Sequence, residues 1–237
     1  MIEKQYMGTY KFLGMLEKIK KYARLVKQRR FDFILQAIAW SVPRWLFFYA
    51  HGVYVFSEKP TWDNHPLEYC TVRLATENDI ELLKNIGMTE TAIRARLTAG
   101  ERAAIVIRDN EVKSAVWGGI GKRYLFYGGN EFDPGHDGVF YYAAYTKSAE
   151  RSRGYYSAAR MLLYNSFASD GFTKSWSVIS ANNPPWLAAV LKRNFRRMGE
   201  TFFVKIFFVK ICYFRKWFEP HKKIYIFFRL PKDLLHV

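Results

Sequence analysis

The stretch FYYAAYTKSAERSRGYYSA, residues 140 to 158, decides how we expect the chain to fold. The apolar and aromatic run Val139–Thr146 is typical of a buried strand, and a helix is predicted from Arg153 to Ser169. A strand that turns directly into a helix leaves free backbone N–H groups at a helix N-terminus, where the dipole favours negative charge. Gly154 removes a side chain where a phosphate would approach. The residues alone are equally compatible with an anion-binding turn and with an ordinary surface turn.

Short strands and helices alternate around this stretch from residue 69 onward. The order of these elements predicts an α/β fold of mixed α+β character, with a mixed sheet and helices on its faces. The strand Lys174–Ser180 is expected to run parallel to Val139–Thr146. The other expected strands are Gly52–Ser57, Cys70–Leu74, Ala103–Arg108, Val112–Trp117, Arg123–Tyr127 and one near Thr201, with a hairpin turn at Asp109-Asn110. The other helices are expected after Thr76, which forms a capping box with Asp79, after Thr89 and after Pro185.

The net charge of +16 is concentrated at the two ends of the 237-residue chain. Residues 1–60 hold 11 Lys and Arg against 4 Asp and Glu, residues 192–237 hold 12 against 3, and the middle is balanced. Three explanations stay open for these basic, aromatic ends. They are a solvated basic surface, attraction to an anionic membrane surface, or nucleic-acid binding, which is disfavoured because no nucleic-acid motif is recognisable.

The N-terminal part differs in composition from the rest. We expect residues 1–66 to form a basic, aromatic extension with an amphipathic helix over residues 12–26, and residues 67–237 to form the main domain. The apolar run over residues 33–56 is interrupted by proline, arginine, histidine and glycine, so no transmembrane helix is predicted. The two cysteines and five histidines follow no metal-ligand spacing, so we expect no metal site and a reducing, cytoplasmic setting.

The region over residues 69–210 resembles the GNAT superfamily of N-acetyltransferases. The family's pyrophosphate loop reads Arg/Gln-x-x-Gly-x-Gly/Ala, and the matching residues here are Arg151, Ser152, Arg153, Gly154 and Tyr155, with Tyr156 where Gly or Ala is expected. The family's Asn, followed twelve residues later by Phe, is matched by Asn183 and Phe195. A looser pattern resembles GNAT proteins that accompany surface-polysaccharide or lipid biosynthesis (Arg96-Leu97, Gly100-Glu101, Trp117, Tyr145-Thr146, Arg153-Gly154).

The resemblance implies a mostly antiparallel sheet in which two parallel strands splay apart at Tyr145-Thr146 to bind the pantetheine arm of acetyl-CoA or another acyl-CoA. It implies direct attack of a primary amine on the thioester, with no cofactor held permanently. The residues that it assigns to binding of the co-substrate are Tyr145, Thr146, Arg151, Ser152, Arg153, Gly154, Tyr155, Tyr156, Ser157 and Asn183.

Catalytic groups are harder to assign from the sequence. A general base must take the proton of the attacking amine, and acidic and histidine side chains crowd the loop before the strand Val139–Thr146. Asp137 and His136 are our first choices, followed by Glu131 and by Tyr142 on the strand itself. Many relatives carry a Tyr that protonates the leaving thiolate, but Val190 stands at the matching position.

Other functions remain open at this point. The basic surface would suit an acidic acyl carrier protein as the donor of a long acyl chain, as in an N-acyl amino acid synthase. The missing Tyr and Gly would suit a non-catalytic protein that binds a membrane surface. An amino sugar, an amino acid and a lipid headgroup are all compatible acceptors.

We predict that the two basic ends form one surface that rests on the inner face of an anionic membrane. Each Lys or Arg near such a bilayer contributes about 1 kcal/mol, and this attraction fades with salt because the Debye length falls to about 3 Å at 1 M. Flotation with anionic vesicles should therefore show binding at low salt that weakens at high salt, with neutral vesicles as the control. No binding to anionic vesicles at low salt would contradict the prediction.

Overall fold

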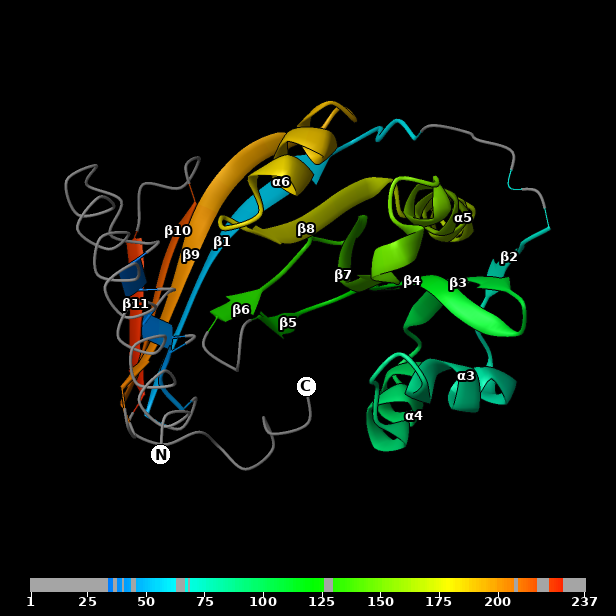
Figure 1. Cartoon of the computed structure of the whole chain (residues 1–237). Helices are drawn as coiled ribbons and strands as arrows, with labels where there is room; N and C mark the ends of the chain where they lie inside the picture. Colours follow the sequence, from blue (N-terminus) through cyan, green and yellow to red (C-terminus); the bar gives the residue numbers. More distant parts are fainter. Residues whose placement is uncertain are drawn as a thin grey trace, which may run out of the picture.

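A nine-stranded, curved sheet organises the described part of the chain in this computed structural model (Figure 1). Neighbouring strands are antiparallel except for one parallel pair, β7 and β8. The predicted mixed, mostly antiparallel sheet is therefore confirmed. In sheet order the strands are β11 (Lys222–Phe227), β10 (Val209–Lys216), β9 (Arg196–Ile206), β1 (Phe47–Ser57), β8 (Lys174–Ser180), β7 (Gly138–Thr146), β4 (Glu111–Gly119), β3 (Arg102–Arg108) and β2 (Thr71–Leu74).

The structure describes residues 34–35, 38–39, 41–43, 46–62, 67, 69–125, 130–206, 209–216 and 222–227. The helix predicted over residues 12–26 lies outside these residues, as do most of the basic side chains at both ends of the chain. The surface that we predict to rest on a membrane therefore stays a prediction.

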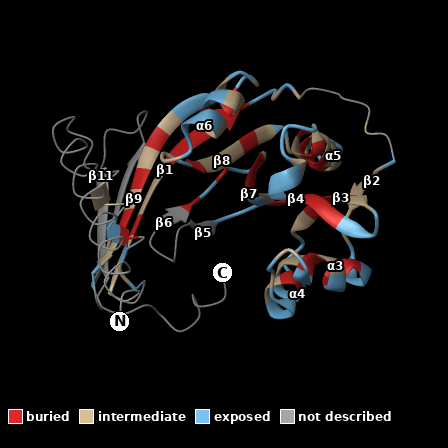
Figure 2. Ribbon diagram, in the orientation of Figure 1, coloured by how far each residue is buried: buried red, intermediate tan, exposed pale blue. Residues whose placement is uncertain are grey.

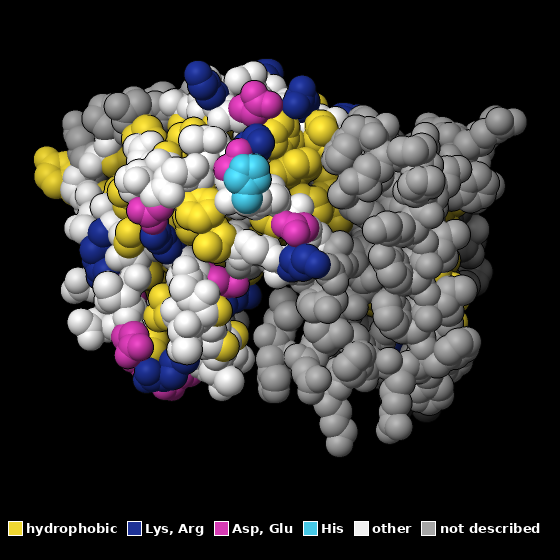
Figure 3. All heavy atoms as spheres, turned by 180° about the vertical axis from the view of Figure 1, so that it is seen from behind, with side chains coloured by type: hydrophobic (Ala, Val, Ile, Leu, Met, Phe, Trp, Pro, Cys, Tyr) yellow, Lys and Arg dark blue, Asp and Glu magenta, His cyan; other side chains and the backbone are white. Residues whose placement is uncertain are grey.

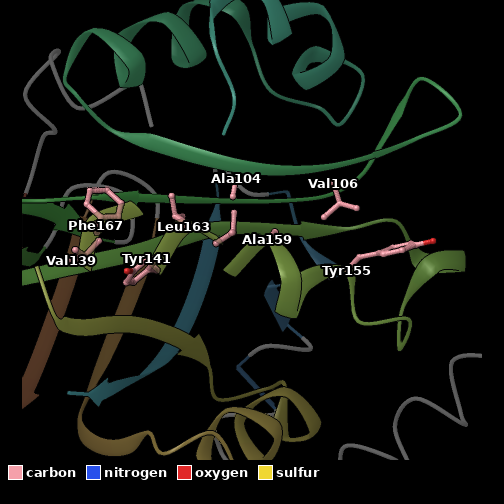
Figure 4. Close-up of a cluster of buried hydrophobic side chains, with 9 residues drawn as sticks. Ala104, Val106, Val139, Tyr141, Tyr155, Ala159, Leu163 and Phe167 are labelled. Carbon is pink, nitrogen blue, oxygen red and sulfur yellow. The ribbon is translucent and has the colours of Figure 1, made fainter. Parts of the chain in front are cut away.

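Helices cover both faces of the sheet, as expected. On one face α5 (Tyr155–Ala168) packs across β2, β3 and β4, and α6 (Pro184–Leu191) lies near β8. On the other face α3 (Ile80–Lys84) and α4 (Glu90–Thr98) cover β3 and β4 (Figure 1). Because side chains alternate along a strand, Ala104 and Val106 of β3 pack under α5 (Figure 4), whereas Ala103 and Ile105 pack under α3 and α4. Buried residues accordingly run along the middle of the sheet (Figure 2).

Local sequence signals explain several boundaries. Thr89 caps α4, because its hydroxyl accepts a hydrogen bond from the Ala92 N–H at 3.3 Å. Asp109 and Asn110 both have φ of 54°, as a tight turn between two antiparallel strands requires. Gly118 lies where α5 approaches the sheet, and an added Cβ would come within 2.9 Å of the Phe167 ring.

Two strand predictions need correction. The segment predicted as one more strand of the sheet forms β5 (Arg123–Leu125), which instead pairs with β6 (Asn130–Phe132) in a separate hairpin. We expected a plain loop at β6. The hairpin forms because Phe132 buries its ring against Tyr54, Phe140 and Trp176, and only 2% of Phe132 remains exposed.

Strand β1 is longer than predicted and lies at the centre of the sheet. We expected only a short strand over Gly52–Ser57, inside the N-terminal extension. Instead β1 pairs with β8 on one side and with β9 on the other. Strand β9 begins at Arg196, five residues before the predicted Thr201. The division of the chain at residue 66 stays a prediction, but the sheet takes a central strand from the N-terminal side of that division.

In the residues that the structure covers, no helix is long and apolar enough to cross a bilayer. On the face shown in Figure 3, basic and acidic side chains are interspersed among the described residues. This agrees with the balanced charge of the middle of the sequence.

An ion pair closes the turn between β2 and α3. Asp79 accepts hydrogen bonds from both terminal nitrogens of Arg73, at 2.5 and 2.6 Å, and from the Thr76 backbone N–H at 2.8 Å. With Thr76 it forms the predicted capping box. The hydrogen bonds from Arg73 are the main reason why the pKa of Asp79 lies below its usual value. A lowered pKa means that the folded state binds this proton less readily than the unfolded state, so the pair stabilises the fold above the unfolded pKa.

We therefore predict that Asp79→Asn lowers the free energy of unfolding at pH 7 by about 1.5–3 kcal/mol, the usual value for hydrogen bonds to a charged group. In the wild type this contribution should be lost as the pH falls below about 4, the unfolded pKa of aspartate. Urea unfolding at pH 7 and pH 3 measures both effects. Glu81→Gln is the control, because its pair with Lys84 is exposed. A difference between Asp79→Asn and wild type that is as large at pH 3 as at pH 7 would contradict the prediction.

Candidate active site

The parallel strands β7 and β8 part in the middle of the sheet. Their pairing runs from Gly138 with Lys174 to Tyr141 with Ser177, and β7 then continues to Thr146 with β4 as its only paired neighbour among the described strands. Our prediction placed the parting at Tyr145-Thr146, four residues later. The free edge of β7 beyond Tyr141 can pair with an extended ligand, as an exposed strand edge does with a peptide.

A β-bulge in β7 accompanies this parting. Tyr142 pairs with Trp117 and Tyr145 pairs with Ala115, so Ala143 and Ala144 together face one residue of β4. Ala143 has φ of 47°, a left-handed conformation that is uncommon for a residue with a side chain. Both alanines are exposed, although the first half of β7 is buried. The bulge therefore brings polar backbone groups of a central strand to the surface.

A cavity of about 320 Å³ lies at the parting, between the sheet and the helices α5 and α6. Its lining is largely aromatic and aliphatic, with one charged side chain, Arg160 of α5. Trp62, Tyr156 and Trp186 form one wall, in which the Tyr156 and Trp186 rings meet edge to face at 4.5 Å. The other residues that line it are Val116, Tyr141, Tyr142, Ala143, Ala144, Ser177, Val178, Ile179, Ser180, Val190 and Phe195.

The N-terminus of α5 lies next to this opening and has the features of an anion-binding turn. Gly154 caps the helix in the left-handed conformation, with φ of 81°, and no side chain occupies the cap. The first turn contains no acidic residue, so its N–H groups and the helix dipole meet no negative side chain there. Arg151 is exposed, and Arg153 is half exposed beside Glu150 at 3.3 Å. A phosphate group fits this arrangement.

The two parallel strands part at a bulge, beside the N-terminus of the helix that joins them. The resemblance predicts this layout. The fold is GNAT-like. No protein-family model matches the chain, and no curated protein sequence matches it at a significant level.

Among solved structures, the chain is similar to a GNAT-family protein from Novosphingobium aromaticivorans at 12% identity and a TM-score of 0.49, covering 66% of this chain and 63% of that one. It is also similar to a GNAT-family acetyltransferase from Colwellia psychrerythraea at 13% identity and a TM-score of 0.47, covering 68% of this chain and 56% of that one. The chain thus spans less than two thirds of the length of either protein. A third similar structure is an N-acetyltransferase from Staphylococcus aureus, at 13% identity and a TM-score of 0.45, covering 58% of this chain and 98% of that one. These are likenesses of fold.

The residues that the sequence assigned to the co-substrate are only partly brought together in this GNAT-like fold. Arg151, Ser152, Arg153 and Gly154 form the turn before α5, as predicted. The Tyr145 carbonyl and the Thr146 hydroxyl bond to the Ser114 hydroxyl on β4, at 2.8 and 3.0 Å.

Four other assigned residues have structural contacts. Tyr155, the first residue of α5, is buried in the core between that helix and the sheet (Figure 4), and Tyr156 lines the cavity. Ser157 is buried and accepts a hydrogen bond from Arg193 at 3.4 Å. Asn183 caps α6, because its side chain accepts from the Trp186 N–H at 3.3 Å. Their roles in binding stay predictions.

The candidate bases of the loop lie before the start of β7, whereas the turn before α5 follows the end of β7. Asp137 forms an ion pair with Lys174 at 2.8 Å, and the hydrogen bond from that lysine is the main reason why the pKa of Asp137 is lowered. His136 is exposed, and the side chain of Glu131 is not among those described. Asp137 lies five residues before Tyr142, or about 16 Å along an extended strand. Neither Asp137 nor His136 lines the cavity.

Among the candidate bases with described side chains, Tyr142 is the one that lies at the opening. Its hydroxyl donates a hydrogen bond to the Glu101 carboxylate, and the Arg96 guanidinium lies over its ring, with Cζ 4.9 Å from the centroid. The sequence gives no sign of this contact, because Glu101 immediately precedes β3 and lies forty-one residues away from Tyr142 in the chain. Only the pairing of β3 with β4 and of β4 with β7 brings the two together.

Proposed function

We propose that this protein is an acyl-CoA-dependent N-acyltransferase that transfers an acetyl or similarly short acyl group to a primary amine. The observation that supports the proposal best is the parting of β7 from β8 beside the uncapped N-terminus of α5. One end of this opening suits a pyrophosphate, and the free edge of β7 suits an extended pantetheine arm with its amide groups. The volume of about 320 Å³ is at the low end for ligand pockets, which favours a short acyl group over a long one.

In this proposal the first turn of α5 binds the pyrophosphate. The N–H groups after Gly154 point along the helix axis toward it, and Arg151 and Arg153 add positive charge at the rim. The exposed bulge at Ala143 and Ala144 offers backbone donors and acceptors to the pantetheine amides. The thioester then lies near Tyr142, where the strands first part.

The chemistry is a direct displacement. The amine nitrogen forms a bond to the thioester carbonyl carbon, the C–S bond breaks, and the CoA thiolate leaves. The proton lost by the amine passes to Tyr142 as the phenol gives its own proton to Glu101, its hydrogen-bond acceptor. Val190 stands where many relatives have a tyrosine that protonates the leaving thiolate. It lines the cavity, but its side chain has no proton to donate. Burial raises the pKa of Tyr156, so this phenol in the same cavity stays protonated and is available to the thiolate.

We also propose a cytoplasmic setting, with the basic ends of the chain resting on the membrane. The support for membrane contact is the distribution of charge in the sequence. An acyl carrier protein as donor would suit the same basic surface.

We predict that Gly154→Asp abolishes CoA binding, because the new carboxylate would face a phosphate at the start of α5. Isothermal titration calorimetry with CoA measures the effect. Gly121→Asp is the matched control, since Gly121 has a similar φ of 74°, an added Cβ there meets no atom within 4 Å, and the residue follows β4, outside the turn before α5. Unchanged affinity in Gly154→Asp would refute this binding site.

We predict that Tyr142→Phe and Glu101→Gln each lower kcat by about 100-fold, the lower end of the usual range for general-base catalysis. The KM for acetyl-CoA should change little, because neither residue lies at the α5 turn. Steady-state kinetics with a panel of amines measures both constants. Asp137→Asn serves as the comparison, and it should leave kcat within a few-fold of wild type. A large loss in Asp137→Asn or His136→Ala, with full activity in Tyr142→Phe, would place the base in the loop before β7 instead.

A further inference from the structure

Arg160 is a buried cation with no acidic partner among the described residues. It lies in the second turn of α5, lines the cavity at the parting of β7 and β8, and is only 1% exposed. No ion pair to a described carboxylate is found for it, although most arginines elsewhere on the described sheet and helices have one, such as Arg73, Arg94 and Arg102. Its Nε and Nη1 atoms are inaccessible to solvent and have no hydrogen-bond partner in the structure.

The groups that do contact Arg160 are aromatic rings. Its Cζ lies 3.1 Å from the centroid of the Tyr141 ring and 5.5 Å from that of Trp62. Rings attract a cation through their faces, but they leave the in-plane N–H donors without acceptors. Burial lowers the pKa of Arg160, and the nearby phenols of Tyr156 and Tyr141 partly oppose this. An arginine nevertheless stays charged at neutral pH.

An unpaired charge at such a position is costly. The effective penalty for burying an ion is several kcal/mol, and an apolar side chain of similar volume is often neutral or stabilising in its place. Tyr141, Trp62 and the rest of the apolar lining would accept a methionine or leucine at position 160. The ring contacts offset part of this cost. They do not satisfy the N–H donors at Nε and Nη1, whereas an anionic ligand does.

We propose that Arg160 binds a carboxylate that a substrate carries into this cavity. The inference rests on the proposed function, because an acyl transfer to an amine offers two sources of that carboxylate. One is an acyl group with a terminal carboxylate, and the other is an amino acid acceptor, whose carboxylate accompanies the attacking amine. In both cases the carboxylate accepts charge-assisted hydrogen bonds from the guanidinium, and the apolar walls contact the carbon chain.

A carboxylate fits the position better than a phosphate does. The phosphates of the co-substrate are expected at the exposed turn before α5, and Arg160 lies five residues into that helix, about 7.5 Å further along its axis. The walls there are the rings of Tyr141, Tyr156 and Trp62, which suit the apolar chain that carries the anion. A carboxylate is flat and matches the planar fork of arginine.

The test compares acids with neutral counterparts of the same size. Calorimetric titrations at constant ionic strength use wild type, Arg160→Met and Arg160→Lys. Arg94→Met is the control, because Arg94 is half exposed on the opposite face. The acyl arm uses acetyl-CoA, succinyl-CoA and butyryl-CoA. The acceptor arm uses glycine and glycinamide in the presence of CoA. A third arm, without CoA, uses succinate and succinamide, and the melting temperature of each ligand-free variant is also measured.

We expect wild type and Arg94→Met to prefer the acid over its neutral counterpart by about ten- to hundredfold, the usual contribution of hydrogen bonds to a charged group. Arg160→Met should lose that preference and still bind acetyl-CoA, with a melting temperature at or above that of wild type, and Arg160→Lys should keep part of the preference. A preference for succinyl-CoA assigns the carboxylate to the acyl group, and a preference for glycine assigns it to the acceptor.

Two results separate the failure of this inference from that of the proposed function. If acetyl-CoA binds but no arm shows a preference that depends on Arg160, the carboxylate site is refuted and the acyltransferase proposal stands. If no CoA compound binds wild type, the proposed function fails, and the succinate arm decides the carboxylate site by itself. A lower melting temperature in Arg160→Met without any change in ligand preference would show that the arginine only stabilises the fold.

Discussion

Between Tyr141 and Tyr142 the one parallel strand pair of the described sheet comes apart, and the candidate site depends on that event. The one extra residue of the β7 bulge raises the local twist, which turns β7 away from β8 while it stays paired with β4. Ala143 adopts a conformation with φ of 47°, which costs about 1 kcal/mol or more for a residue with a side chain. Strain of this kind persists where the surrounding structure holds it, and such positions cluster at functional sites.

The helix α5 connects the two chemical features of the opening. Its first residues offer free N–H groups and a positive dipole end to an anion, and its second turn carries a buried cation into the cavity. Its other face packs Ala159, Leu163 and Phe167 against β3, β4 and β7 (Figure 4). One rigid element thus fixes the distance between the exposed turn proposed for phosphate and the buried arginine proposed for a carboxylate. A substrate that used both would present its negative groups at that spacing.

Much of the fold could be predicted from local patterns, because those patterns act over a few residues. The capping box at Thr76, the cap at Thr89 and the turn at Asp109-Asn110 all mark real boundaries. The place of β1 could not be predicted in this way, since strand order depends on pairings between distant residues. Arg160 was missed for a related reason. A single arginine on a helix usually reaches solvent, and its burial here follows from how Trp62, Tyr141 and α6 close around it.

The central position of β1 has a consequence for how the chain reaches this structure. Its two neighbours, β8 and β9, lie more than 110 residues later in the sequence, so the first of the described strands to leave the ribosome is among the last that can find its partners. Pairings that distant close large loops and slow folding. Until they form, the strand Phe47–Ser57, of which six residues in the second half are buried in the native state, is an unpaired apolar edge. Such edges attract other chains, and during synthesis this segment is a natural client for chaperones.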